Sequence, residues 1–237
     1  MSHISHLTSH ISKRYAIIVA GGSGTRMGSA LPKQFLLLNG LPVLMHTLLA
    51  FHNSQSKPDL ILVLPAAYHE YWTELCRKHN FTIPHQLISG GETRFHSVKN
   101  GLDIITADEL SLIAVQDAVR PMTSTDIIDA AYKSAAQYGN GVVAVKSRDS
   151  IRQLKNETSS ALPRDEIYLV QTPQTFQSAQ LKKAYEQAYT PNFTDDASVV
   201  EAMGVNIHLV DGSHKNIKIT FPEDIAIMEL LMKGASS

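Results

Sequence analysis

A glycine-rich segment near the start of the chain carries two cations at a fixed spacing. It follows a short apolar run at 15–19, and Arg26 and Lys33 lie seven residues apart in sequence. No Asp or Glu occurs before Asp59, so no acid close in sequence neutralises these charges. Glycine lets backbone N–H groups approach an anion closely, and fixed positive charge adds to the attraction. The segment therefore predicts a loop that binds a polyphosphate.

Two well-known phosphate-binding loops do not fit this segment. The Walker loop needs Gly-Lys followed by Ser or Thr, whereas Gly24 is followed by Thr25 and Arg26. The dinucleotide fingerprint G-x-G-x-x-G is one residue shorter than the spacing of Gly22, Gly24 and Gly28. It also needs an acid about 20 residues further on, where this chain has none. These differences argue against a P-loop NTPase and against a hydride-transferring dehydrogenase.

Other common catalytic patterns are missing from the sequence. Ser23 does not lie in the G-x-S-x-G pattern of a nucleophilic serine, and His69-Glu70 is not continued to H-E-x-x-H. The 11 histidines are scattered along the chain without the spacing of metal ligands. The chemistry is therefore expected to rest on charge and on phosphate binding, without a nucleophilic triad.

The composition predicts a globular protein with a large core. The chain has 237 residues, 43% of them hydrophobic, and a net charge of −1, which argues against a general nucleic-acid-binding protein. No apolar run approaches the roughly 20 residues that a membrane-spanning helix needs. The single cysteine, Cys76, excludes an intramolecular disulfide and suits a buried apolar role. We expect a cytoplasmic protein that binds neither nucleic acid nor membrane.

Short apolar runs alternate with amphipathic segments, which is typical of an α/β fold. The expected strands are 15–19, 60–64, 85–88, 112–116, 141–145, 206–210 and 217–220, and the expected helices are 43–52, 67–79, 94–106, 125–138, 178–188, 196–203 and 222–232. This order predicts a mostly parallel, Rossmann-like sheet flanked by helices, with ligands beyond the carboxyl ends of the strands. Residues 15–237 are expected to form one domain, after a flexible tail at 1–14.

Residues 147–170 interrupt this alternation. They read as two extended segments around a polar turn at 156–160. Such a hairpin is either a surface feature without a functional role or an arm that contacts another molecule.

Six motifs, taken together and in this order, resemble the 2-C-methyl-D-erythritol 4-phosphate cytidylyltransferases of the non-mevalonate isoprenoid pathway. They span the chain from about residue 15 to 232: the loop of 20–35 with its Pro-Lys-Gln-Phe end, Gly-Gly-Glu-Thr-Arg-Phe-His-Ser-Val at 90–98, Asp-Ala-Val-Arg-Pro at 117–121, Gln-Thr-Pro-Gln-Thr-Phe at 171–176, Thr-Asp-Asp-Ala-Ser at 194–198 and Asn-Ile-Lys-Ile-Thr at 216–220. One such motif is weak, but the ordered set is specific.

The resemblance implies a reaction in which a phosphate monoester attacks the α-phosphorus of CTP and expels pyrophosphate. It implies that Arg26 and Lys33 stabilise the transition state, and that Lys218 and Arg164 bind the phosphate of the polyol substrate. It also implies Mg²⁺, or another divalent cation, held mainly by the CTP phosphates with Asp117 nearby. The segment at 147–170 would then be a β-arm that clasps a second subunit of a homodimer and delivers Arg164 to the partner's site.

The same resemblance assigns residues to the two substrates. Those matched to the nucleotide are Ala20, Gly21, Gly22, Gly24, Gly91, Glu92 and Ser97. Those matched to the polyol phosphate are Asp117, Ala118, Arg120, Ser150 and Thr172, where Ser150 replaces the threonine usual in the family.

Two other functions remain open from the sequence. The related D-ribitol 5-phosphate cytidylyltransferases have a similar loop, although the motifs at 92–98 and 194–198 favour the methylerythritol branch. A non-catalytic nucleotide-binding protein would keep the fold, but it would have no need to retain Arg26, Lys33, Asp117 and Lys218.

Overall fold

The computed structural model describes residues 13–21, 31–106 and 111–234. Residues 22–30 of the expected phosphate loop lie outside this part of the chain, including the predicted site residues Gly22, Gly24 and Arg26, as does nearly all of the expected tail at 1–14.

Seven strands of the described chain form one sheet in the order β11-β7-β10-β6-β1-β4-β5. Their bounds are β1 Arg14–Val19, β4 Asp59–Leu64, β5 Gln86–Ser89, β6 Leu112–Asp117, β7 Asn140–Lys146, β10 Tyr168–Gln177 and β11 Leu209–Asp211. Strands β6, β1, β4 and β5 are parallel neighbours, and β11 is parallel to β7. Strand β10 runs antiparallel to both of its neighbours. The expected mainly parallel α/β sheet is confirmed.

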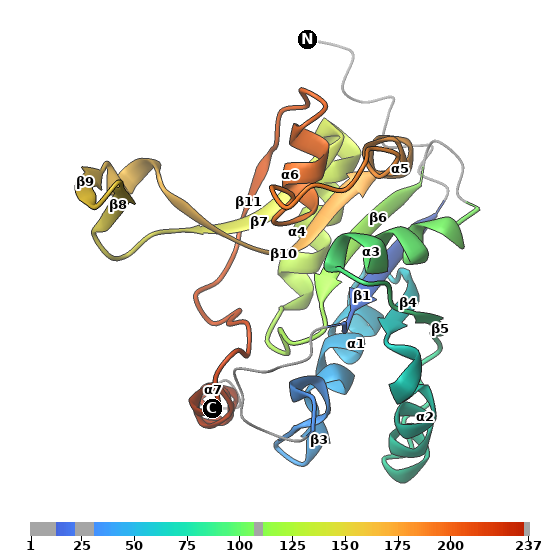
Figure 1. Ribbon diagram of the computed structural model, residues 1–237. Coiled ribbons are helices and arrows are strands. Elements are labelled where there is room, and N and C mark those ends of the chain that lie inside the picture. Colours follow the sequence, from blue (N-terminus) through green and yellow to red (C-terminus); the bar gives the residue numbers. More distant parts are fainter. Residues whose placement is uncertain (1–12, 22–30, 107–110, 235–237) are drawn as a thin grey trace.

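Helices cover both faces of this sheet (Figure 1). The helices are α1 Val43–Asn53, α2 His69–Lys78, α3 Arg94–Asp103, α4 Thr125–Tyr138, α5 Ser178–Ala184, α6 Asp196–Glu201 and α7 Glu223–Lys233. Short 3-10 turns are η3 Lys33–Phe35, η4 Ala66–Tyr68 and η5 Arg164–Glu166, and two small hairpins are β2 Leu37–Leu38 with β3 Leu41–Pro42, and β8 Ile151–Lys155 with β9 Thr158–Leu162.

Strand β1 shows how the sequence divides the core into two layers. Ala16 and Ile18 face the cluster built with α1, α2 and α4, whereas Ile17 and Val19 face the cluster built with α3, α5 and α6. Because side chains alternate along a strand, a run buried on both faces must be apolar throughout. Each fully buried aliphatic side chain contributes about 1.5–3 kcal/mol to folding. The continuous apolar run at 15–19 therefore makes β1 a central strand.

Two expectations about the strands were wrong. The segment 217–220 is not a strand, because within the described chain its backbone pairing with the sheet region is one hydrogen bond, from Ile219 N to Val119 O at 3.0 Å. Residues 171–177 of strand β10 were not expected to be a strand, since the polar residues and Pro173 obscure the pattern; only 168–170 belonged to an expected extended segment. The register of β10 against β7 shifts between Val170 and Gln174, and proline is tolerated in a sheet at such an irregularity.

The hairpin of β8 and β9 projects from the body of the molecule (Figure 1). It turns at Asn156 and Glu157, whose φ angles of 46° and 63° match a two-residue hairpin turn. The expected extended segments and polar turn are thus confirmed. The clasping of a second subunit stays a prediction, as does the division into a tail and one domain.

Candidate active site

A cavity of about 250 Å³ opens at the carboxyl end of β6, beside β10 and the segment that precedes α7. Its lining residues are Arg94, Asp117, Arg120, Val170, Gln171, Thr172, Gln174, Thr194, Asp195 and Lys218. The sequence-predicted residues Asp117, Arg120, Thr172 and Lys218 therefore meet here, although they are spread over about 100 residues of the sequence. The position agrees with the rule that ligands of open α/β sheets bind beyond the strand ends.

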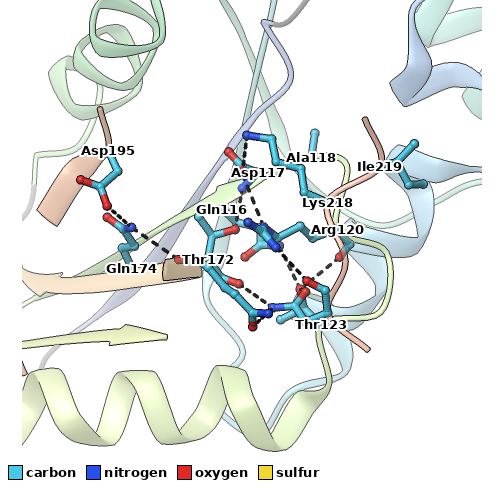
Figure 2. Close-up of polar contacts among 12 residues, drawn as sticks. Gln116, Asp117, Ala118, Arg120, Thr123, Thr172, Gln174, Asp195, Lys218 and Ile219 are labelled. Carbon is cyan, nitrogen blue, oxygen red and sulfur yellow. Dashed lines mark hydrogen bonds and ion pairs between the residues drawn. The ribbon is translucent and has the colours of Figure 1, made fainter. Parts of the chain in front are cut away.

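Asp117, the last residue of β6, is surrounded by three cations. Its Oδ2 atom lies 2.9 Å from Lys218 Nζ and 3.5 Å from Arg120 Nε, and its Oδ1 atom lies 3.6 Å from Arg94 Nε. Figure 2 shows Lys218 and Arg120 turned towards this carboxylate. Burial by itself would raise the pKa of Asp117, but Arg94, Lys218 and Arg120 together hold it well below its ordinary value. Asp117 is therefore ionised at neutral pH.

The backbone segment that carries Lys218 is held in place by Asn216, which lies two residues earlier and is fully buried. The Asn216 amide Nδ2 donates to Gln171 Oε1 (3.1 Å) and to Thr172 O (2.9 Å), and its Oδ1 accepts from Thr123 Oγ1 (2.9 Å). Arg120 Nη1 also donates to the backbone oxygen of Asn216, at 2.7 Å. This network ties a segment with little strand pairing of its own to β10 and to the loop after β6.

Thr172 and Ala118 join the same site through the backbone. Thr172 Oγ1 accepts a hydrogen bond from Asp117 N at 3.1 Å. Ala118 N donates to Val19 O at 3.0 Å, and Ala118 O accepts from Thr47 Oγ1 at 2.8 Å. Both residues therefore fix the end of β6, which carries Asp117, against the neighbouring strands.

Lys33 lies next to the same C-terminal segment. It begins the turn η3, is largely buried, and donates from Nζ to Ile219 O at 2.8 Å. Lys33 thus contacts the residue that follows Lys218, although 186 residues separate Lys33 from Ile219. The structure describes the place of Lys33, whereas its partner in sequence, Arg26, lies outside the described residues.

Two of the residues predicted to bind the nucleotide, Gly21 and Gly91, lie next to Ser97. The Ser97 hydroxyl accepts from Gly91 N at 3.1 Å, and a Cβ atom on Gly21 would lie 3.4 Å from it. A Cβ atom on Gly91 would lie 2.5 Å from His96 Cβ, so the loop before α3 packs as it does because residue 91 is glycine. Ala20 is buried beside Gly21, and Glu92 is exposed at the start of this loop.

The two predicted site residues on the β-arm do not line the cavity within this chain. Ser150 and Arg164 are both exposed and flank the β8–β9 hairpin. The Arg164 guanidinium contacts Asp165, 3.9 Å away, and Arg148 O, 3.5 Å away.

Sequence reasoning missed several residues of the cavity. Arg94, Gln171, Gln174 and Asp195 all line it. Gln174 Nε2 donates to Asp195 Oδ2 at 2.9 Å, and Gln174 Oε1 accepts from Ala197 N at 2.8 Å, so β10 holds the start of α6 (Figure 2). All four residues lie inside the motifs at 90–98, 171–176 and 194–198, which was the available signal.

The described helices include none that is long and apolar enough to cross a bilayer. The described residues also contain no group of three or more His, Cys, Asp or Glu side chains placed to hold a metal ion.

Comparison with known proteins gives a consistent result. Residues 15–234 match the family model described as 2-C-methyl-D-erythritol 4-phosphate cytidylyltransferase. A protein of that name from Bacteroides thetaiotaomicron is 49% identical over 220 residues, covering 93% of this chain and 100% of the relative. The namesake from Bacteroides fragilis is 48% identical over 219 residues, covering 92% of this chain and 99% of the relative.

Solved structures give the same answer. The 2-C-methyl-D-erythritol 4-phosphate cytidylyltransferase of Francisella tularensis superposes with a TM-score of 0.76 at 32% identity, covering 92% of this chain and 99% of that one. The 4-diphosphocytidyl-2C-methyl-D-erythritol synthase of Anaerococcus prevotii has a TM-score of 0.79 at 26% identity, covering 93% and 96%. Because sequence and fold both agree over nearly the whole chain, this protein belongs to the 2-C-methyl-D-erythritol 4-phosphate cytidylyltransferase family.

Proposed function

We propose that this protein transfers the cytidylyl group of CTP to 2-C-methyl-D-erythritol 4-phosphate, releasing pyrophosphate. Membership of the family supports the reaction. The observation that carries the proposal to this chain is the cavity in which Asp117 lies between Lys218, Arg120 and Arg94. One carboxylate among three cations suits a ligand that has both hydroxyl groups and a phosphate, because hydroxyls donate to the carboxylate and the phosphate binds the cations.

The substrate phosphate needs no general base. A phosphate monoester has a second pKa near about 6, so it is largely a dianion at neutral pH. One of its oxygens forms a bond to the α-phosphorus of CTP while the bond from that phosphorus to the bridging oxygen breaks, and pyrophosphate leaves. The protein's task is to lower the repulsion between two anions and the charge that builds on the α-phosphoryl oxygens.

The cations divide this task. We assign Lys33 and Arg26 to the α-phosphoryl oxygens, because Lys33 lies at the end of the glycine-rich segment and its neighbour Gln34 donates to Ala20 O at 2.9 Å. Lys218 holds the polyol phosphate from the other side, and Asp117, Arg120 and Thr172 surround the polyol. On the nucleotide side, we assign Ala20, Gly21, Gly22 and Gly24 to the base and phosphates, and Gly91, Glu92 and Ser97 to the cytosine and ribose.

A divalent cation such as Mg²⁺ fits this site only if the CTP phosphates supply most of its ligands. Mg²⁺ in such enzymes is commonly bound by one or two carboxylates together with substrate phosphates. Asp117 is the carboxylate that the family resemblance places near the ion, and its three cationic neighbours leave it little capacity to hold a metal alone. When bound, the ion would neutralise charge on the phosphates.

We further propose a homodimer that exchanges its β-arms, in the cytoplasm. Arg164 and Ser150 are exposed on the arm and do not line the cavity of their own chain. An arm that reaches a second subunit would bring Arg164, whose planar guanidinium binds phosphate oxygens in pairs, to the polyol phosphate of that subunit.

Pyrophosphate release tests the reaction. The purified protein is incubated with CTP and Mg²⁺, and with either 2-C-methyl-D-erythritol 4-phosphate or D-ribitol 5-phosphate. Release with the first substrate alone is the expected result. Release with ribitol phosphate alone would replace the substrate in our proposal, and folded protein that binds CTP but releases nothing with either substrate would refute catalysis.

Mixed dimers test the exchange of arms. An Arg164→Ala chain and a Lys33→Ala chain are unfolded together, refolded and purified as a hybrid by two affinity tags. One site of the hybrid then has both native residues, so activity should return well above the sum of the two parent variants. A confirmed hybrid with no such gain would show that Arg164 does not act across the subunit boundary.

A further inference from the structure

The three cations around Asp117 are held in different ways. The Lys218 side chain is 42% exposed, whereas those of Arg94 and Arg120 are 29% and 10% exposed. Lys218 contacts Asp117 Oδ2, and Arg94 contacts the other oxygen, Oδ1. An exposed ammonium on a flexible stem can move to an arriving phosphate, but a guanidinium held by several other groups cannot.

Arg94 is fixed from behind by a fully buried carboxylate. Its Nη1 and Nη2 atoms donate to the two oxygens of Asp196 at 3.0 Å and 2.6 Å, which is a bidentate pair. Tyr185 donates its hydroxyl to Asp196 Oδ1 at 2.6 Å. The Tyr185 ring in turn stacks on Phe95, with 4.6 Å between centroids. Helix α3, the end of α5 and the start of α6 are thus joined behind the cavity, and the remaining guanidinium nitrogen, Nε, faces Asp117.

We propose that Arg94 is a positioning residue: supported by Asp196 and Tyr185, it keeps the Asp117 carboxylate oriented towards the polyol when Lys218 moves to the substrate phosphate. This inference rests on the proposed function, because it assigns a task to Arg94 within that same site.

The balance of charges explains why such a residue is needed. Asp117 is 8% exposed, and a buried carboxylate that loses its cation is strongly disfavoured. When Lys218 turns to the phosphate, Arg94 and Arg120 remain beside Asp117. Of these two arginines it is Arg94 that contacts Oδ1, so it determines the rotation of the carboxylate about its last bond.

A double-mutant cycle separates positioning from general support of the fold. Arg94→Gln alone would leave Asp196 buried without its cation, so the first member is the paired change Arg94→Gln with Asp196→Asn, which removes both charges and keeps amide hydrogen bonds. The second member is Asp117→Asn. Arg77→Gln, an exposed arginine on α2, is the matched control.

The paired change should raise KM for the polyol phosphate about tenfold, which lies within the coupling range of contacting charged residues. KM for CTP should change less than about twofold, since Arg94 is bound to the polyol side of the site. In the Asp117→Asn background the paired change should have little further effect, because the neutral amide has no need of a cation. Arg94→Lys with Asp196 kept should lose less than the paired change, because a cation remains beside the two carboxylates. It should not reach the wild-type KM, since one ammonium cannot bind Asp196 in a bidentate way and still contact Asp117.

Two results would overturn the inference. One is an equal fold-change from the paired substitution whether or not the chain also carries Asp117→Asn, which would mean that Arg94 acts independently of Asp117. The other is an equal rise of both KM values, which would indicate general damage to the site. A wild-type protein that releases no pyrophosphate would refute the proposed function before any variant is compared, so the two failures are distinguishable.

Discussion

Replacing Asn216 with alanine should damage both stability and substrate binding. The buried amide Nδ2 is the donor to Gln171 Oε1 and Thr172 O, and its removal leaves these two acceptors without that partner. A buried polar group without a partner costs about 1–3 kcal/mol, so two such groups cost about 2–6 kcal/mol of the free energy of unfolding. Thr123 loses less, because its hydroxyl also donates to Arg120 O.

The kinetic consequence follows from the place of Asn216 in the chain. Lys218 lies two residues further on, in a segment whose backbone is tied to the sheet region by the hydrogen bond of Ile219 N to Val119 O. Without the Asn216 amide, this segment is held less firmly, and the Lys218 ammonium is placed less accurately. KM for the polyol phosphate should therefore rise more than KM for CTP, as it should in Lys218→Ala.

Urea unfolding followed by circular dichroism measures the stability, and steady-state pyrophosphate release measures both KM values. Asn192→Ala, at an exposed asparagine, is the control and should change stability by less than about 0.5 kcal/mol. A loss below about 1 kcal/mol for Asn216→Ala would refute the argument from unsatisfied acceptors. A normal KM for the polyol phosphate would refute the argument that Asn216 positions Lys218.

Three further predictions concern single side chains. Lys33→Ala should lower kcat about 10²–10³-fold, the cost of removing one preorganised charge donor at a transition state, and kcat within about tenfold of the wild type would contradict the role of Lys33. Gly91→Ala should raise KM for CTP, because the new Cβ would lie 2.5 Å from His96 Cβ. The control is Gly234→Ala, where a Cβ meets nothing closer than 3.9 Å. Equal KM values for CTP in the two variants would count against the packing argument. Burial raises the pKa of the Cys76 thiol to about 11, so a thiol reagent at about pH 8 should label the folded protein slowly and the urea-unfolded protein fast; equal rates would show that Cys76 is not protected.

The sheet was largely predictable because its signals are local. Five apolar residues in a row at 15–19 and the run at 112–116 bury both faces of a strand, whatever lies around them. Asp117 follows the second run directly, so its place at the strand end could be read from the chain. Strand β10 escaped prediction because Pro173 and its polar neighbours give no local strand signal, and pairing with β6 and β7 decides their conformation.

Local sequence was sufficient for the family, the order of most strands and helices, and the residue types of the site. Tertiary packing settled which of those residues share one cavity and which support them. Arg94 and Asp196 lie 102 residues apart, and Lys33 and Ile219 lie 186 apart, so no local spacing announces either contact. Those contacts form because packing around the sheet brings distant segments together. The charges and amides that become buried there are stable only when they are paired or hydrogen-bonded. Periodicity and short motifs depend only on residues that are close in sequence. The role of Arg94 therefore became visible only from its position beside Asp117 in the structure.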